Sequence, residues 1–189
     1  RALKTTVLPD GGHAGRSPSD GLALLYDLLV LDDALSQRGR PAPEEMSRAI
    51  DRLFAALKVF ALADGRLPAM QGGDEGASAD VRHALAEDDS DAPVRDRLEV
   101  SGYHRMQAGA LQVFVDAGAP ARGEWSAAAA AQPLALEIIV SGRRLITNVG
   151  WTDRCHATHA LRLIDGASTA SLGDASAGEP LRGFRAEQL

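Results

Sequence analysis

The spacing of apolar residues changes from a helical to an alternating pattern part-way along the chain, and this change limits the possible folds. In residues 19–37 leucines recur three or four positions apart, which is typical of an amphipathic helix. In residues 134–140 apolar residues instead occupy every second position, as in a strand with one buried face. Because the helical pattern comes first and the strand pattern second, the sequence predicts an α+β chain rather than an alternating α/β fold.

Two helices are predicted in the first half of the chain. The first covers residues 19–37, with Ser17 or Ser19 as its N-cap and a proline in its first turn. The second runs from about residue 43 to 62 and is followed by Gly65, a common residue after a helix end. Since the link between them is short, the two helices should form an antiparallel hairpin.

The second half predicts antiparallel strands. Residues 67–93 are rich in glycine and acidic residues and predict an irregular connection. Ser141–Gly142 lies between two strand-like runs and predicts a tight hairpin turn. The predicted strands cover residues 111–115, 134–140, 144–149 and 161–164, with a further one at Tyr103, His104 and Arg105. We therefore expect a helical segment at 1–92 and an antiparallel β-sandwich at 93–189.

Charge and composition exclude several classes of partner. The 189 residues carry a formal net charge of -6, so no excess of cations favours nucleic acid or an anionic membrane surface. An acidic polysaccharide would need a local concentration of cations. The sequence contains no apolar run long enough to span a membrane and no recognisable signal peptide. Cys155 is the single cysteine, which excludes an intrachain disulfide.

Two histidine-containing segments are candidate sites. Residues 10–18 (DGGHAGRSP) lie directly before the first helix, so His13 and Arg16 could face an anion, or the loop could merely cap the helix. His156 and His159 lie three apart, and on a strand they would point to opposite faces, so we predict no metal site and no cofactor.

A resemblance to a known family extends over most of the chain. Residues 10–18, 49–76, 101–120 and 134–150 resemble, in this order, stretches of heparinase II/III-type polysaccharide lyases of bacteria. The resemblance implies the last helices of an incomplete (α/α) toroid followed by an antiparallel β-sandwich. It also implies β-elimination on an acidic, uronic-acid-containing glycan such as a glycosaminoglycan, in the periplasm or cell envelope.

The resemblance also implies roles for individual residues. In such lyases one group neutralises the uronate carboxylate, and a His or Tyr base removes the C5 hydrogen before an acid protonates the leaving oxygen. His13 would be the toroid residue nearest the carboxylate, and His159 would be the histidine that the sandwich contributes. Arg16, Tyr103 and Arg105 are the predicted substrate-binding residues. We expect His159 to face the interior or the cleft and His156 to face solvent.

Two departures from the family pattern suggest alternatives to catalysis. The stretch around Met70, where a toroid tyrosine is expected, contains no tyrosine. The sequence Ala130–Ala131–Gln132 also lacks a histidine that many members carry. The chain could therefore belong to a catalytically impaired relative that binds glycan or acts as a scaffold. A third hypothesis is a structural sandwich without a glycan role, which an acidic run (residues 87–91) at the cleft mouth would support.

Overall fold

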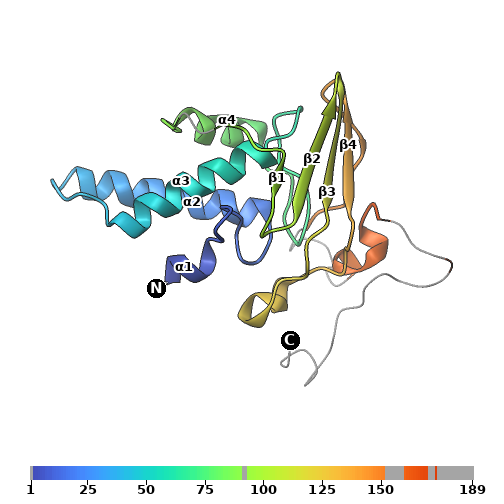
Figure 1. Cartoon of the computed structure of the whole chain (residues 1–189), viewed down its shortest axis with the longest axis horizontal. Helices are drawn as coiled ribbons and strands as arrows, with labels where there is room; N and C mark the ends of the chain where they lie inside the picture. The colour runs from blue at the N-terminus through green and yellow to red at the C-terminus, as the bar shows by residue number, and fades with distance from the viewer. Residues whose placement is uncertain (1, 91–92, 152–159, 170–172, 174–189) are drawn as a thin grey trace.

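A computed structural model describes residues 2–90, 93–151, 160–169 and 173, and these form a layer of helices against one face of a sheet (Figure 1). The helices are α1 (Ala2–Thr6), α2 (Pro18–Ser36), α3 (Glu44–Phe60) and α4 (Ser78–Ala86). The strands in the described part of the chain all follow these helices, which confirms the predicted α+β order.

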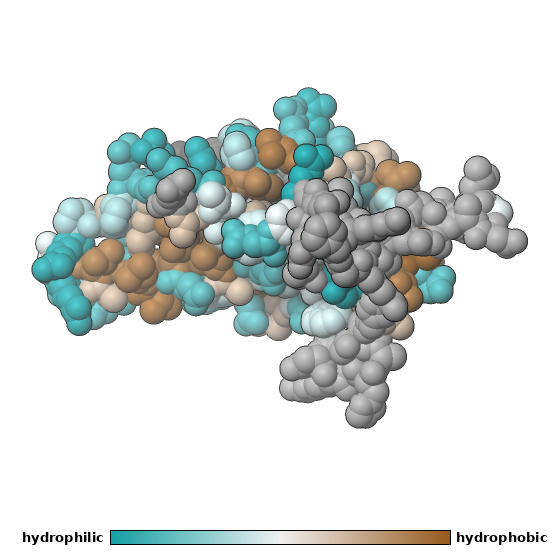
Figure 2. Space-filling model, turned by 90° about the horizontal axis from the view of Figure 1, so that it is seen from below, coloured by the Kyte–Doolittle hydropathy of each residue, from teal (hydrophilic) through white to brown (hydrophobic). Residues whose placement is uncertain are grey.

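The two predicted helices are confirmed as α2 and α3, which pack against each other as a hairpin. The side chain of Ser17 caps α2 by accepting a hydrogen bond from the amide of Asp20, and Pro18 occupies the first turn. The apolar residues of α2 lie on all sides of the helix, so some of them face solvent. Val30 is 69% exposed, whereas Leu28 is buried. Figure 2 shows hydrophobic side chains gathered along this helical end of the molecule.

The helix α4 corrects the prediction that residues 67–93 are irregular throughout. Val81, Ala84 and Leu85 have helical spacing and pack against the helical core. The neighbouring glycines and acidic residues concealed this short pattern in the sequence. Within the described residues, no helix combines the length and the apolar character that a bilayer crossing requires.

Within the described ranges, five strands form one antiparallel sheet in the order β1 to β5. Ser141 and Gly142 both have positive φ, 50° and 73°, and join the last two strands as the predicted tight hairpin. The strands are β1 (Arg97–Leu98), β2 (Tyr103–Ala108), β3 (Leu111–Asp116), β4 (Leu136–Val140) and β5 (Arg143–Ile146).

The strand predicted at residues 161–164 is wrong. Two short 3-10 turns, η2 (Ala160–Arg162) and η3 (Ile164–Gly166), occupy this stretch, and a third, η1 (Gly123–Ala128), lies between β3 and β4. The amide of Leu163 donates to the carbonyl of Ala160, and that of Gly166 to the carbonyl of Leu163, which is the hydrogen-bond spacing of 3-10 turns and not that of a strand.

The main core lies between α3 and the inner face of the sheet. Phe60 of α3 contacts Tyr103 and Phe114, with ring centroids 5.2 and 5.9 Å away, and Ile139 is buried beside them. The outer face of the sheet carries apolar side chains such as Met106 that remain exposed. The second sheet of the expected sandwich stays a prediction, because the described residues form a single sheet.

The loop before α2 approaches α3 so closely that one position requires glycine. Gly11 has φ +91°, and a Cβ placed on it would lie 1.9 Å from the carbonyl oxygen of Arg52. Gly39, after α2, also has a positive φ of +67°, but no atom lies within 4 Å of its added Cβ. Substituting each glycine by alanine therefore distinguishes the cost of the backbone conformation, which applies to both positions, from the cost of a clash, which applies only to Gly11.

We predict that Gly11→Ala lowers the free energy of unfolding much more than Gly39→Ala. A positive φ alone costs an alanine about 1–2 kcal/mol, and Gly39→Ala should lose only this amount. Gly11→Ala adds a clash with backbone and should lose roughly 3 kcal/mol or more. Urea denaturation of both variants measures the difference, and equal losses would contradict the close approach.

Candidate functional site

The loop at residues 7–17 is folded back on itself and fastened to the sheet. Val7 and His13 form an isolated bridge, and the amide of Leu8 donates to the carbonyl of Gly12. The carboxylate of Asp10 reaches across the molecule and accepts hydrogen bonds from the amides of Val100 and Ser101, at 2.8 and 2.6 Å. It also accepts from the hydroxyl of Ser101 and the amide of Gly12. Asp10 thereby joins the helical part to the turn after β1.

Arg16 makes the second connection between this loop and the sheet. Its side chain is only 5% exposed, and its guanidinium donates to the carbonyl of Ser101 and forms an ion pair with Asp116 at the end of β3. The other carboxylate oxygen of Asp116 accepts from the amide side chain of Gln71 at 2.7 Å. Because both charges are buried, their mutual hydrogen bonds are needed to offset the desolvation cost.

Tyr103 completes this buried cluster. Its ring lies 5.0 Å below the Arg16 guanidinium carbon, and its hydroxyl donates to the backbone carbonyl of Arg16. Burial raises the pKa of Tyr103 well above its usual value, and the nearby Asp116 carboxylate raises it further. The tyrosine is thus held as a neutral hydrogen-bond donor inside the protein.

The predicted substrate-binding residues therefore lie in two places. Arg16 and Tyr103 are together, but their polar groups are engaged within the protein. Arg105 lies elsewhere on the inner face, where its guanidinium donates to the carbonyl of Lys58 at 3.0 Å near the end of α3. The roles of these three residues toward a substrate stay predictions.

His13 is the predicted site residue that remains half-exposed beside this cluster. Its ring lies edge-on to Trp125 of η1, with centroids 5.0 Å apart at 81°. Its Nδ1 accepts a hydrogen bond from the amide of Gly15 at 3.1 Å. Burial lowers the pKa of His13, and the carboxylate of Asp20 opposes this shift. A neutral His13 with Nδ1 acting as acceptor carries its proton on Nε2, so it can donate to a ligand.

Sequence reasoning missed four members of this site. Asp10 lies within the motif at residues 10–18, but the motif alone indicates no role for it. Trp125 and Asp116 belong to no recognisable sequence motif. Gln71 lies in the stretch where a tyrosine was expected, and its Oε1 accepts from the amide of Ala130 at 3.3 Å. The two departures from the family pattern are thus directly joined.

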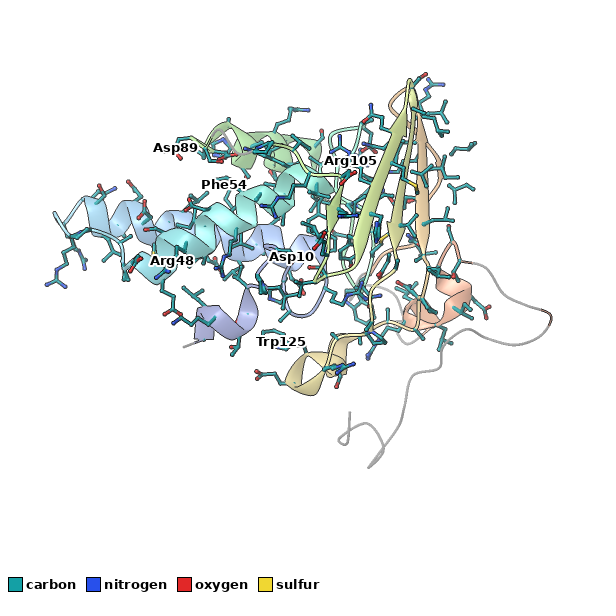
Figure 3. The ribbon with its side chains drawn as sticks, viewed as in Figure 1. Asp10, Arg48, Phe54, Asp89, Arg105 and Trp125 are labelled. Atoms are coloured by element: carbon teal, nitrogen blue, oxygen red, sulfur yellow. The ribbon has the colours of Figure 1, made fainter. Side chains whose placement is uncertain are left out.

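The other candidate groups do not add to this site within the described residues. His159 and His156 lie outside the part of the chain that the structure describes. In the described ranges no three His, Cys, Asp or Glu side chains are grouped so that they could hold a metal ion. Of the acidic run, Asp88 pairs with Lys58, and Figure 3 places Asp89 and Trp125 on opposite sides of the helical layer. The described part of this run therefore does not surround His13.

Comparison with known proteins identifies the family. The model of the heparinase II/III-like C-terminal family matches residues 91–189. The chain belongs to this family. FtsZ-localized protein C from Caulobacter vibrioides (strain NA1000 / CB15N) is 51% identical over 187 residues, which are 99% of this chain. The chain spans only 32% of the length of that relative.

Solved heparinase structures share this fold. Heparinase III superposes with a TM-score of 0.68 at 12% identity, covering 94% of this chain and 34% of that one. A mutant of the heparan sulfate lyase HepC from Pedobacter heparinus gives 0.67 at 17% identity, with 85% and 29% coverage. At these identities the likeness establishes the fold, and it confirms the resemblance inferred from the sequence motifs.

We predict that Asp116→Asn is strongly destabilising, because it leaves the buried Arg16 charge without its partner. Removing one member of a buried pair costs about 3–5 kcal/mol. The matched control is Arg48→Gln, which removes an exposed ion pair with Glu44 on α3 and should cost less than about 1 kcal/mol. Urea denaturation measures both, and a small loss in Asp116→Asn would contradict the proposed role of the pair.

The environment of His13 predicts a pH dependence of stability. The pKa of His13 in the folded chain lies below its unfolded value, so the unfolded state binds the proton more readily. Its contribution to stability is therefore complete above the unfolded pKa of about 6.5 and is lost as pH falls toward the folded pKa. NMR titration of the His13 ring should give a lowered pKa, which Asp20→Asn should lower further. Asp27→Asn, on the exposed side of α2, is the control and should leave it unchanged.

Proposed function

We propose that this chain is part of a division-site protein that uses the heparinase fold as a binding scaffold rather than as a lyase. This function is the non-catalytic scaffold already considered from the sequence, with a cellular location added. It rests on one relative and on the chemistry of the residues around His13.

The main support is the identity shared with FtsZ-localized protein C. Identity of 51% over 99% of the chain far exceeds the 12–17% shared with the solved lyases. The name of that relative associates it with FtsZ, and the similarity includes the whole loop and sheet that build the site. We therefore infer that this chain also acts where FtsZ assembles.

The geometry supports a scaffold more than a lyase. Proton transfer needs groups that reach the substrate and change their protonation state near the working pH. Tyr103 is fully buried with a raised pKa, and Arg16 is paired with Asp116. His13 faces Gly15 with Nδ1, so its neutral form presents a donor rather than a base on Nε2.

A second candidate function is β-elimination on an acidic glycan in the cell envelope. The observation that favours it is the half-exposed pair of His13 and Trp125. An indole face can pack on a sugar ring, and the Nε2 proton of His13 could bind a uronate carboxylate. This candidate needs further catalytic groups, for which His159 is the residue predicted from the family.

The location can be tested in cells of the bacterium that encodes the protein. A fluorescent fusion of the full-length protein should form a band at mid-cell that coincides with labelled FtsZ. Depletion of FtsZ should disperse this band within one division cycle. A uniform distribution around the envelope in dividing cells would refute the division-site function.

The two candidate functions differ in an activity assay. Full-length protein given a panel of uronic-acid polysaccharides should release no unsaturated, ultraviolet-absorbing products if it is a scaffold. Products that vanish in His13→Gln but persist in His104→Gln would instead establish the lyase. His104 is a suitable control because it is exposed on β2, on the face of the sheet opposite to Tyr103.

A further inference from the structure

A glycine near the start of α2 leaves room beside His13 that the fold itself does not require. Gly21 has no positive φ, and in a helix glycine is less favourable than alanine because it has more backbone freedom to lose. Among the described residues outside its own helix, a Cβ added to Gly21 would meet only the Cβ of His13, at 3.9 Å. That distance is an ordinary van der Waals contact, so alanine would fit here. The room at Gly21 is therefore available to a ligand.

Two half-exposed side chains border this room with different chemistry. The indole of Trp125 lies edge-on to His13 at 5.0 Å, and Figure 3 places Trp125 between η1 and the loop that carries Asp10. Because Nδ1 of His13 accepts from the amide of Gly15, the neutral ring keeps its proton on Nε2. A ligand beside His13 thus meets an aromatic ring and a hydrogen-bond donor.

The cation carried by the same loop is not available to an acidic ligand. The side chain of Arg16 is 5% exposed, and its guanidinium is engaged by the carboxylate of Asp116 and the carbonyl of Ser101. Withdrawing Arg16 toward a ligand would leave Asp116 as a buried charge without its partner, which is strongly unfavourable. Arg16 therefore does not act as a counter-ion for a uronate.

The other charges near His13 also disfavour an acidic ligand. Asp20 lies close enough to act on the His13 ring, and from the first turn of α2 its carboxylate already offsets the positive end of the helix dipole. From η1, Arg122 at the N-cap and Glu124 in the first turn contribute one charge of each sign. A ligand carboxylate would therefore meet a net negative charge from these groups.

What remains suits a ligand whose groups both donate and accept hydrogen bonds without carrying charge. A sugar hydroxyl can accept from Nε2 of His13 and can donate to the carboxylate of Asp20. The C–H face of a pyranose ring can pack on the indole of Trp125. A cationic ligand would instead be opposed by the Nε2 proton, which is a donor.

We propose that the room bordered by His13, Gly21 and Trp125 binds a neutral sugar and discriminates against uronic acids. Trp125 supplies the packing surface, and His13 and Asp20 orient the hydroxyls. Gly21 lets the ring approach the start of α2.

A neutral sugar in this place is held and not cleaved by β-elimination. That reaction requires a carboxylate on the ring, since the carboxylate makes the C5 hydrogen acidic enough for a base to remove. A neutral pyranose has no such group. The inference rests on the proposed function in this respect alone, because it gives the binding scaffold a ligand that the lyase reaction could not consume.

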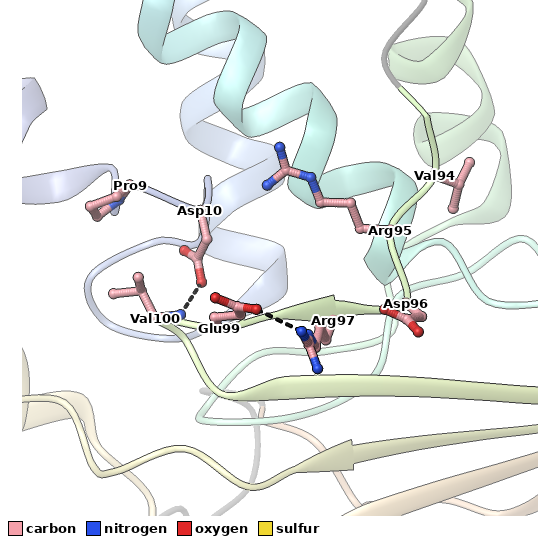
Figure 4. Close-up of a pocket in the computed structure, with 8 residues that line it drawn as sticks. All are labelled: Pro9, Asp10, Val94, Arg95, Asp96, Arg97, Glu99 and Val100. Carbon is pink, nitrogen blue, oxygen red and sulfur yellow. Dashed lines mark hydrogen bonds and ion pairs between the residues drawn. The ribbon is translucent and has the colours of Figure 1, made fainter.

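A separate hollow beside the same loop provides a place for a control substitution (Figure 4). It has a volume of roughly 630 Å³ and lies between Pro9, Asp10 and residues 94–100. Its lining contains no aromatic side chain. Val94 borders it and is 60% exposed, so Val94→Ala shortens an accessible side chain away from His13.

The test compares matched sugars that differ only at C6. Full-length protein is titrated by calorimetry with hexasaccharides of glucose, mannose and galactose, and with the corresponding hexasaccharides of glucuronic, mannuronic and galacturonic acid. At least one neutral sugar should bind saturably, and roughly tenfold or more tightly than its uronic counterpart. Asp20→Asn should reduce this preference because it removes the repelling charge. Absence of neutral-sugar binding, or equal binding of the uronic acid, would overturn the inference.

Gly21→Ala separates a binding role from a structural one. It should weaken sugar binding by roughly tenfold or more while the melting temperature stays equal or rises, since alanine favours the helix. Gly39→Ala is the matched control and should show the opposite pattern, with a lower melting temperature and normal binding. Trp125→Ala should also lose binding, whereas Val94→Ala should retain it. Normal binding in Gly21→Ala would contradict the proposed site.

The cellular assay distinguishes failure of this inference from failure of the proposed function. A protein that forms the mid-cell band but binds no neutral sugar would refute the sugar site and leave the division-site function standing. A protein that binds a neutral sugar through Gly21 but is spread evenly around the envelope would support the sugar site and refute the division-site function.

Discussion

The buried ion pair between Arg16 and Asp116 is the interaction on which the arrangement of this molecule depends. A charge pair taken out of water is stable only when the remaining donors and acceptors are also satisfied. Asp116 meets this condition by accepting from Arg16, Gln71 and the amide of Gly118. Arg16 itself has a positive φ of 66°, so the loop adopts an uncommon backbone conformation to deliver it. Because this ion pair fixes Arg16, it also fixes the position of the loop that carries His13 and Asp10.

A second polar connection joins the helical part of the chain to β4 and β5. Glu137 of β4 is fully buried and accepts from the amide of Ala69, while Arg144 of β5 binds both Glu137 and Asp64. Burial raises the pKa of Glu137, although Arg144 and the surrounding amides favour its charged form. The apolar core of Phe60, Tyr103 and Phe114 thus lies between two polar connections, which together define how the helices sit on the sheet.

The sequence predicted those features that repeat locally. The helices near 19–37 and 43–62, the turn at Ser141–Gly142 and the α+β order follow from spacing that can be read within a few residues. The helix α4 was missed, and residues 161–164 were wrongly predicted as a strand, because short apolar patterns fit helix, 3-10 turn and strand almost equally. The family was predicted from motifs in order, and the family model confirms it. The partners of Asp10, Arg16 and Gln71 could not be predicted, because they lie 45 to 100 residues away.

The distance along the chain between Arg16 and Asp116 has a consequence for how the protein folds. Loop closure over 100 residues is entropically costly, so contacts of this separation form late. The hairpin of α2 and α3 depends on near neighbours and can form while the strands are still being synthesised. Until β3 is complete, the Arg16 guanidinium has no buried partner and remains hydrated. The loop that carries His13 therefore gains its final shape only after the sheet exists. During synthesis the helical hairpin can thus assemble first, and the site around His13 assembles later.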